Sequence, residues 1–419
     1  MTKPLIGFCG LTHLGICSAV AAIAKGFKVV CYDSNDDVVK SLKQGILSIV
    51  EPDVANVLER NKKLVTFTNN IKEVTSCDVI YISLDIKTSS NGRSDLGPIN
   101  ELTQKILKNL KKSKILIVLS QVPPGFTRNL FSTKHKIYYQ VETLIFGKAL
   151  ERALYPERII IGGHSPHKCL PEKYLFFLNS FNCPIIHMKY ESAELTKIAI
   201  NLFLLSSLST TNKMAEICEK INADWHEIMP ALRLDKRIGE YAYISPGLGV
   251  SGGNLERDLK TISILSSEQN IENTLFTTFK EINDNRKKWV INKLNKIIND
   301  KAKRRIGILG LTYKENTHSL KNAASLELIP ILENHDVVVY DPAVDVENIF
   351  SWCIHAKNIK EVLRGADILI ILTPWDQFKD LKLELIRQEM KGDTIIDPFK
   401  VFDQNEVKKN KLISHVIGS

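Results

Sequence analysis

Short apolar runs alternate with segments of helical spacing through the first part of the chain. The apolar runs lie at residues 5–9, 28–32, 79–83, 115–119 and 158–161, and segments between them, such as residues 14–25, repeat apolar positions with the period of a helix. Apolar runs separated by helical segments are typical of strands buried on both faces of a parallel sheet. The alternation therefore predicts parallel βαβ units in a doubly wound sheet.

The pattern changes near residue 191 and returns near residue 303. Between these positions strand signals are rare, and long helical periodicities cover residues 191–223 and 268–299. Apolar runs then follow at residues 305–309, 337–340, 368–372 and 394–396, with a helical segment at residues 324–333. We predict an α/β fold with two Rossmann-like doubly wound domains joined by a helical middle domain, divided at 1–190, 191–302 and 303–419.

Composition limits the classes of protein to which the chain can belong. Of its 419 residues 44% are hydrophobic and 25% are charged, which is typical of a globular protein and excludes a disordered or collagen-like chain. No apolar stretch approaches the roughly 20 uninterrupted residues of a membrane helix, so we expect no membrane partner. The cysteines form no C-x-x-C pair, which favours a reducing, cytoplasmic location and no metal site.

The net charge of +9 suits an anionic small molecule as well as nucleic acid. The most basic stretch, residues 286–305, also contains Trp289 and regularly spaced Ile and Val, as a packed amphipathic helix does. We therefore expect a small anionic partner and no nucleic acid.

The first predicted strand runs into a helix through the sequence GLTHLG at residues 10–15. The dinucleotide pattern G-x-G-x-x-G uses its glycines for a tight turn, close approach to the pyrophosphate and helix packing. The second glycine is replaced here by Thr12, and Asp33 ends the next strand, where a carboxylate accepts bonds from ribose hydroxyls and repels the extra phosphate of NADP. We predict NAD as the cofactor, with contacts from Gly10, Thr12, His13, Leu14, Gly15 and Asp33. Because Thr12 crowds the pyrophosphate, the alternative is a turn that no longer binds a dinucleotide.

Two later segments carry candidate chemistry. Lys197 and Asn201 lie four residues apart on a predicted helix, hence on one face. An amine that takes a proton and an amide that orients an oxygen suit a hydroxyl losing hydride, although such pairs also occur on solvated helix surfaces. The stretch at residues 246–258 is rich in glycine and ends at Asp258, which we expect to open a helix. It is interpreted as a loop that closes on a ligand, with a merely flexible loop as the alternative.

Several motifs together resemble the UDP-glucose/GDP-mannose dehydrogenase family over essentially the whole chain. They are YPERIIIG at residues 155–162, ELTKIAIN at 194–201, RIG at 237–239, LGLTYK at 309–314, YDP at 340–342 and TPWDQF at 373–378. The resemblance implies an NAD-binding domain, a helical domain that forms a homodimer and a C-terminal domain that holds a UDP-sugar. It also implies a role in polysaccharide biosynthesis, in which the sugar's C6 alcohol is oxidised to a carboxylate with two NAD.

The resemblance assigns roles to individual residues. Catalytic roles fall on Lys197, Asn201, Asp258 and Glu142. Further cofactor contacts fall on Gln121, Arg257 and Lys321. Substrate contacts fall on Arg237, Gly249, Gly252, Tyr313 and Lys314, of which Arg237 is expected to reach the substrate of the neighbouring subunit.

One departure from the family changes the expected chemistry. The family loop reads G-G-x-C-x-x-x-D, and its cysteine attacks the aldehyde on the way to a thioester. In this chain the loop SGGNLERD at residues 251–258 has Asn254 at the nucleophile's position, and no cysteine occurs between Cys218 and Cys353. An amide provides no usable nucleophile for this step. We therefore expect an NAD-dependent oxidoreductase that acts on the C6 alcohol of a nucleotide sugar without the thioester route.

Two other interpretations stay open. A β-hydroxyacid dehydrogenase shares the opening LIGFCGL at residues 5–11 and the Lys-x-x-x-Asn helix, but it lacks a third part like that from residue 304 onward. A non-catalytic nucleotide- or sugar-binding member is favoured by altered positions such as Thr12 and Asn254. The retained Lys197, Asn201 and Asp258 argue against that interpretation.

Overall fold

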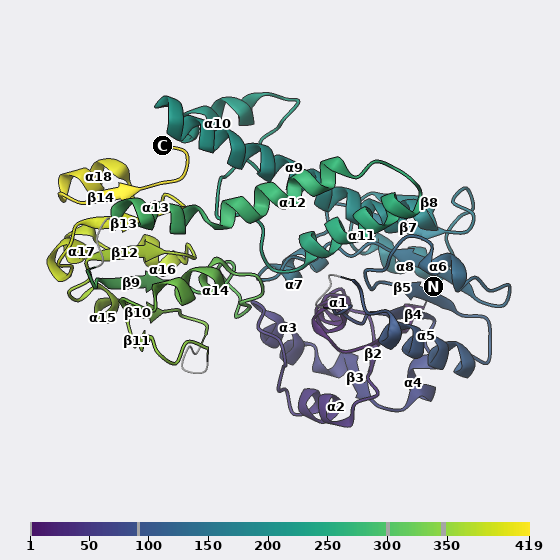
Figure 1. The fold of residues 1–419 in the computed structure, drawn as a ribbon. Coiled ribbons are helices and arrows are strands. Elements are labelled where there is room, and N and C mark those ends of the chain that lie inside the picture. Colours follow the sequence, from purple (N-terminus) through teal and green to yellow (C-terminus); the bar gives the residue numbers. More distant parts are fainter. Residues whose placement is uncertain (1, 90–92, 299–301, 345–348) are drawn as a thin grey trace. The chain divides into compact units, whose positions relative to one another are not determined.

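The structure is a computed structural model that describes residues 2–89, 93–298, 302–344 and 349–419 (Figure 1). The chain divides into two compact units, Met1–Ile200 and Asn201–Ser419, and each contains its own sheet. The long helix α9 (Tyr190–Ile221) contributes residues to both units. The division into three domains at 1–190, 191–302 and 303–419 stays a prediction, and residues 299–301 near its second boundary lie outside the described residues.

The sheet of the first unit has the strand order β3-β2-β1-β4-β5-β6-β7-β8. The strands are β1 (Ile6–Cys9), β2 (Val29–Tyr32), β3 (Val65–Thr68), β4 (Val79–Ile82), β5 (Ile115–Val118), β6 (Lys136–Gln140), β7 (Ile159–Gly163) and β8 (Ile185–Lys189). The expected parallel pairing holds except between β6 and β7, which are antiparallel. The expectation is wrong there because the chain turns back through the short helix α7 (Ala149–Leu154), which packs beside α1 (His13–Ala24), instead of crossing over the sheet.

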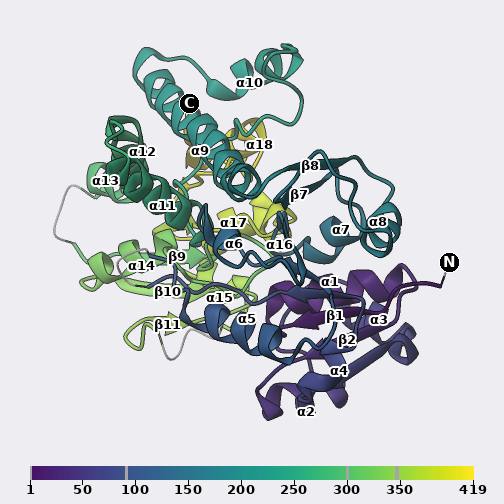
Figure 2. The same ribbon diagram turned by 90° about the vertical axis from the view of Figure 1, so that its right-hand side faces the viewer.

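Helices cover both faces of this sheet. Besides α1 and α7 they are α2 (Asp36–Lys43), α3 (Val54–Arg60), α4 (Ile71–Thr75), α5 (Gly97–Asn109), α6 (Phe126–Asn129) and α8 (Glu172–Asn179), with a 3-10 turn at Lys62–Leu64. Phe8 and Tyr81 face one core together with α1, whereas Ile80 and Ile82 face a second core together with α5. Figure 2 shows α1 beside strands β1 and β2. Burial on both faces explains why the central strands are continuous apolar runs.

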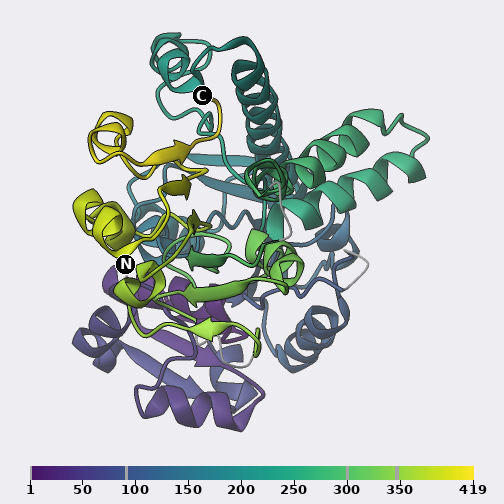
Figure 3. The ribbon, with the colours of Figure 1, turned by 60° about the vertical axis from the view of Figure 1, so that its left-hand side comes forward.

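The second unit contains a six-stranded parallel sheet with the order β11-β10-β9-β12-β13-β14 (Figure 3). Its strands are β9 (Arg305–Leu309), β10 (Asp336–Tyr340), β11 (Ile354–His355), β12 (Ile368–Ile371), β13 (Thr394–Ile396) and β14 (Ile413–His415). Its helices after α9 are α10 (Trp225–Leu234), α11 (Asn254–Glu268), α12 (Thr274–Lys287), α13 (Trp289–Ile297), α14 (Ala324–Leu328), α15 (Ile359–Leu363), α16 (Asp376–Lys379), α17 (Leu383–Glu389) and α18 (Gln404–Lys409), with a 3-10 turn at Ile329–Leu332.

The two sheets repeat one topology. The order β3-β2-β1-β4-β5-β6 of the first sheet and the order of the second are both the doubly wound order 3-2-1-4-5-6, which confirms the predicted fold class. In such sheets ligands bind beyond the carboxyl ends of the central strands, where the strand order reverses. Gly10 follows β1 and Gly310 follows β9 at these positions. Within the described residues no group of His, Cys, Asp and Glu is suited to hold a metal, and no helix has the length and apolar character needed to cross a membrane.

Candidate active site

The turn after β1 has the backbone geometry of a dinucleotide cradle. Gly10 has a φ of +94°, in the left-handed region that favours glycine, and its N–H donates to the carbonyl of Tyr32 at 3.0 Å. A side-chain carbon at Gly15 would lie 2.0 Å from the carbonyl oxygen of Gly10, so only glycine fits there. The turn then leads into α1, whose N-terminal N–H groups form the anion-binding end of a helix.

Asp33 lies at the end of β2, as predicted, and is fixed beside this turn. One carboxylate oxygen accepts the N–H of Leu11 at 2.8 Å, and the other accepts the N–H of Asn35 at 2.9 Å. Each oxygen has a second lone pair, so the carboxylate remains able to accept a ribose hydroxyl.

The Thr12 hydroxyl has a role that the sequence did not predict. It accepts the backbone N–H of Asp85 at 2.9 Å and lies 3.4 Å from the carbonyl oxygen of Ser83, so it joins the turn to the segment after β4. Asp85 in turn places Oδ2 3.4 Å from the N–H of Leu14. Thr12 therefore serves the fold of the turn, and Asp85 brings a carboxylate to the backbone at the start of α1.

His13 is held from the opposite side by Glu51. The imidazole Nε2 lies 2.8 Å from Glu51 Oε1, and the ring packs on Phe146 with centroids 4.3 Å apart. Glu51 also accepts the N–H groups of Gly147 and Ala149 at 2.8 and 3.1 Å. Burial opposes ionisation of Glu51, but these bonds outweigh it and hold its pKa below the ordinary value. The residues that follow β6 are thereby fastened to the start of α1.

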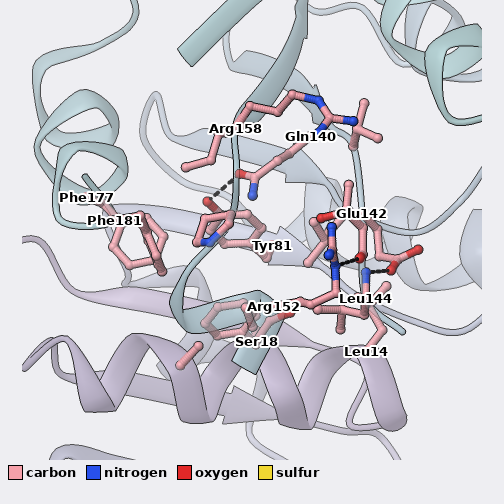
Figure 4. Close-up of a pocket in the computed structure, with 18 residues that line it drawn as sticks. Leu14, Ser18, Tyr81, Gln140, Glu142, Leu144, Arg152, Arg158, Phe177 and Phe181 are labelled. Atoms are coloured by element: carbon pink, nitrogen blue, oxygen red, sulfur yellow. Dashed lines mark hydrogen bonds between the residues drawn. The ribbon is translucent and has the colours of Figure 1, made fainter. Parts of the chain in front are cut away.

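A small cavity of about 70 Å³ lies on the α1 side of the first sheet (Figure 4). Its walls include Leu14 and Ser18 of α1, the ring of Tyr81 and, at one end, Glu142. The hydroxyl of Tyr81 donates to the side-chain carbonyl of Gln140 at 2.9 Å. The cavity is lined mainly by apolar and aromatic groups, and Glu142 contributes a largely buried carboxylate.

Glu142 and Lys197 form an ion pair inside the first unit. The Lys197 ammonium lies 3.3 Å from Glu142 Oε2, and the two side chains are only 10% and 13% exposed. The other Glu142 oxygen accepts the N–H of Leu144, which fixes the carboxylate. Gln121 lies half-buried just beyond the carboxyl end of β5. The structure therefore brings together the predicted catalytic amine of Lys197 and the predicted catalytic carboxylate of Glu142.

Asn201 and Asp258 form a second buried pair, in the other unit. The Asn201 amide donates to Asp258 Oδ2, and Arg257 Nε lies 3.5 Å from Asp258 Oδ1. All three side chains are buried. Lys197 and Asn201 are one turn apart on α9, as predicted. The expectation that Asp258 opens a helix is wrong, because α11 begins directly after Gly253, at Asn254, and Asp258 lies in its second turn.

The glycine-rich loop before α11 is fixed by Asn283 of α12. The Asn283 side chain accepts the N–H of Val250 and donates to its carbonyl at 3.2 Å. Gly249 has a φ of +87°, and a side-chain carbon there would lie 2.8 Å from Asn283 Oδ1. The loop is therefore held in one conformation by a side chain, which argues against a merely flexible loop.

The other end of this loop meets the turn after β9. The N–H of Gly252 donates to the carbonyl of Lys321 at 2.9 Å. A side-chain carbon at Gly252 would lie 3.0 Å from the Tyr313 ring, and one at Gly253 would lie 2.8 Å from Lys321 Nζ. Lys314 Nζ lies 5.8 Å from the centroid of the Tyr313 ring. Four predicted ligand contacts, Gly252, Tyr313, Lys314 and Lys321, thus lie in one region of the second unit.

Two predicted site residues point to solvent. The Arg237 side chain is 88% exposed, and its guanidinium pairs with Asp235 with Nη2 and Oδ2 2.6 Å apart. Asn254 is exposed as the first residue of α11. The structure does not bring Arg237 to the glycine-rich loop within its own chain.

The turn after β9 repeats the first turn with a different use of its carboxylate. Gly310 has a φ of +86°, and Asp341 ends β10 as Asp33 ends β2. Asp341 Oδ2 accepts the N–H groups of Leu311 at 2.7 Å and Thr312 at 3.2 Å and the indole N–H of Trp375 at 3.3 Å. Asp341 Oδ1 accepts the N–H of Ala343 at 2.8 Å, and the residue is only 7% exposed, so this carboxylate is buried and its Oδ2 is saturated by the protein.

The sequence interpretation missed Asp85, Glu51 and Asn283. Asp85 carried a usable signal, since it is the first charged residue after a buried strand and therefore lies at the carboxyl edge of the sheet. Glu51 and Asn283 act over 38 and 33 positions of sequence, and neither belongs to a local pattern.

Comparison with known proteins gives matches along the chain. The UDP-glucose/GDP-mannose dehydrogenase family matches with its NAD binding domain at residues 5–176, its central domain at residues 191–285 and its UDP binding domain at residues 307–404. The UDP-glucose 6-dehydrogenase TuaD of Bacillus subtilis is 28% identical over 99% of this chain and 93% of its own length. The UDP-glucose 6-dehydrogenase of Rickettsia prowazekii is 28% identical over 99% of both chains.

Solved structures match the fold over nearly the whole chain. A UDP-glucose dehydrogenase from Pyrobaculum islandicum superposes with a TM-score of 0.85 at 24% identity, covering 97% of this chain and 96% of that one. A UDP-D-ManNAc dehydrogenase from Pyrococcus horikoshii gives a TM-score of 0.84 at 22% identity, covering 99% of both. At these identities the structures establish a shared fold.

Proposed function

The chain belongs to the UDP-glucose/GDP-mannose dehydrogenase family, and we propose that it is an NAD-dependent oxidoreductase acting on the C6 alcohol of a UDP-sugar. The observation that carries the proposal is the pairing of Lys197 with Glu142 and of Asn201 with Asp258. Lys197 and Asn201 are both buried, and each is held by a carboxylate. A Lys–Asn pair on a solvated surface of α9 would have neither property. The UDP binding domain also separates the chain from a β-hydroxyacid dehydrogenase, which lacks such a part.

The first unit has a cradle that fits the cofactor. Gly10 has a left-handed backbone that favours glycine, Gly15 leaves no room for a side chain, and Asp33 follows β2, where a carboxylate can accept ribose hydroxyls. When bound, NAD supplies the acceptor for the hydride that leaves C6. We assign the diphosphate to the N-terminus of α1 and the ribose to Asp33.

Residues of the chain then orient the oxygen of the substrate's C6 hydroxyl and relay its proton. The Asn201 amide nitrogen is committed to Asp258, which leaves its carbonyl oxygen with no hydrogen-bond donor among the described residues and able to accept the substrate hydroxyl. Glu142 holds the Lys197 ammonium in place, where it stabilises negative charge developing on the oxygen. Because the ammonium is already fully protonated, the hydroxyl proton passes through a water that it holds and from there to solvent.

The chemistry after the first oxidation distinguishes this chain from the family pattern. We propose that Asn254 stands at the position of the family's nucleophilic cysteine, so that no thioester forms and the aldehyde is the product. The proposal is supported by the absence of any cysteine between Cys218 and Cys353.

The NADH yield per sugar consumed tests this proposal directly. The purified chain is incubated with NAD and a panel of UDP-sugars, and NADH and aldehyde are quantified together. We expect one NADH and one aldehyde per sugar. Two NADH per sugar would mean that the acid forms without a thiol and would overturn the proposed end point.

A second candidate function is a non-catalytic binder of nucleotide or sugar. It is favoured by the use of the Thr12 hydroxyl in the fold of the turn and by Asn254. Isothermal titration with NAD and UDP-sugars separates the two functions, because binding without any NADH production supports the binder.

We also propose a homodimer. Its support is a set of exposed apolar side chains on and after α9 and α10, where Phe203 is 80%, Leu234 84% and Tyr241 90% exposed. Light scattering after size exclusion tests this: Phe203→Glu should give a monomer, whereas Ile271→Glu, a change at another exposed apolar residue, should leave a dimer. A wild-type monomer at micromolar concentration would refute the proposal.

A cytoplasmic location and a role in polysaccharide biosynthesis are further proposals. Free cysteines at all eight positions support a reducing compartment. Fractionation of cells that express the chain tests the location, and recovery in a secreted fraction would contradict it.

A further inference from the structure

Asp85 lies beside the start of α1, the end of the helix to which we assign the diphosphate of NAD. It follows β4 by three residues, and its Oδ2 accepts the N–H of Leu14 in the first turn of α1. Its own N–H donates to the Thr12 hydroxyl, which ties this segment to the turn after β1. One bond from the Asp85 carboxylate and one from its backbone N–H therefore hold this residue beside the start of α1.

Helix α1 itself contributes no negatively charged side chain to its N-terminus. The N-cap residue Thr12 makes no side-chain bond to the helix, and the first turn contains no acidic residue. A helix N-terminus attracts negative charge through its free N–H groups and its dipole. Asp85 supplies that charge from a different segment, although its side chain reaches solvent and is not part of a core.

We propose that Asp85 is an internal anion that competes with the diphosphate of NAD for the N-terminus of α1 and thereby sets the cofactor affinity of this chain. The inference rests on the proposed function, because it concerns the same dinucleotide site. Cofactor binding then requires the carboxylate to swing away from Leu14 or to take up a proton.

The surroundings of Asp85 give the sign of the pH dependence. Desolvation by the surrounding protein atoms raises its pKa and Glu142 adds to the rise, whereas Thr12, His13 and Leu14 offset part of it. Cys17, Glu51 and Asp33 are further titratable groups close to this end of α1, and Lys87 follows on the same segment as Asp85. A bound diphosphate adds negative charge beside the carboxylate and raises its pKa further. Binding therefore takes up a proton, and the affinity for NAD rises as the pH falls.

Titration calorimetry of the full chain with NAD, ADP and adenosine tests the proposal. Asp85→Asn keeps the size of the side chain and removes its charge, so at pH 8 it should bind NAD and ADP about tenfold more tightly, the equivalent of a change of one pKa unit. Adenosine, which has no phosphate, should bind equally to wild type and variant. Lowering the pH should strengthen NAD binding to the wild type and narrow the difference from Asp85→Asn.

Asp95→Asn is the matched control, since Asp95 accepts the N–H of Gly97 at the start of α5 in the same unit. It should leave the affinity for NAD unchanged. Asp85→Glu should retain the weaker, pH-dependent binding because the charge is kept.

The inference is overturned if Asp85→Asn binds NAD no more tightly than the wild type, or if adenosine binding improves equally. Failure of both proteins to bind NAD at any pH would instead refute the proposed function.

Discussion

Asn254→Cys places a thiol at the N-terminus of α11, where the family's nucleophile is expected. Asn254 is exposed and is the first residue of the helix, so the exchange should change the free energy of unfolding by no more than about 0.5 kcal/mol. A helix N-terminus stabilises an anion by about 0.3–1 kcal/mol, which lowers the pKa of a thiol by roughly 0.2–0.7 units from its usual value near 8.5. A useful fraction of thiolate should therefore exist at pH 8.

The thiolate would add to the C6 aldehyde to give a thiohemiacetal. Loss of hydride to a second NAD gives a thioester, and water releases the acid and restores the thiol. The assay is the NADH yield per UDP-sugar, which should rise from one to two, with the uronic acid identified by mass spectrometry. Asn254→Ser and Leu255→Cys are the controls, because one lacks the thiol and the other displaces it by one residue, and both should stay at one. A yield of one from Asn254→Cys, with the new thiol confirmed by alkylation, would refute the placement of Asn254.

Three further predictions concern the energetics of the first unit. Glu142→Gln or Lys197→Met alone should lower the free energy of unfolding by about 3 kcal/mol, because each leaves a buried charge unpaired. In urea denaturation the double variant should recover more than half of this loss, and additive losses would contradict the coupling. The Arg128 guanidinium lowers the pKa of Glu191 from 4.5 to about 2, so this pair contributes stability above pH 4.5 that is lost as the pH falls toward 2. Both partners are about 40% exposed, hence Arg128→Ala should cost less than about 1 kcal/mol at pH 7 and nothing near pH 2, as thermal melts across this range will show. Ser18→Met should fill part of the cavity beside α1 and raise the free energy of unfolding by about 1 kcal/mol, whereas a lower melting temperature would show that the cavity does not admit the longer side chain.

The sequence predicted the central strands of both sheets because burial on two faces leaves a continuous apolar run. It did not predict β3 or β6, whose exposed positions carry polar residues such as Thr66 and Lys136 and so break the run. The antiparallel pairing of β6 with β7 also escaped prediction. Strand direction there depends on where α7 packs, and apolar periodicity contains no information about that choice.

The candidate site was predictable where its residues share one element. Lys197 and Asn201 follow from the helical repeat of α9, whereas their carboxylate partners come from distant segments and were expected only from the family resemblance. The place of Asp85 at the edge of the sheet could have been predicted, but its bond to Leu14 could not, because that contact spans 71 positions of sequence. The start of α11 was misplaced because a helix can begin directly after a glycine without an acidic capping residue.

The engagement of Asp341 has a consequence for the stoichiometry of ligand binding. The chain contains two glycine turns of the same design, and on topology alone a titration could be expected to find two equivalents of dinucleotide. The carboxylate of the second turn is buried, and its Oδ2 is covered by Trp375 and by the backbone of its own turn, so an incoming ribose does not reach it. The repeated fold therefore does not provide a second dinucleotide site. A binding isotherm should saturate at a single NAD per polypeptide.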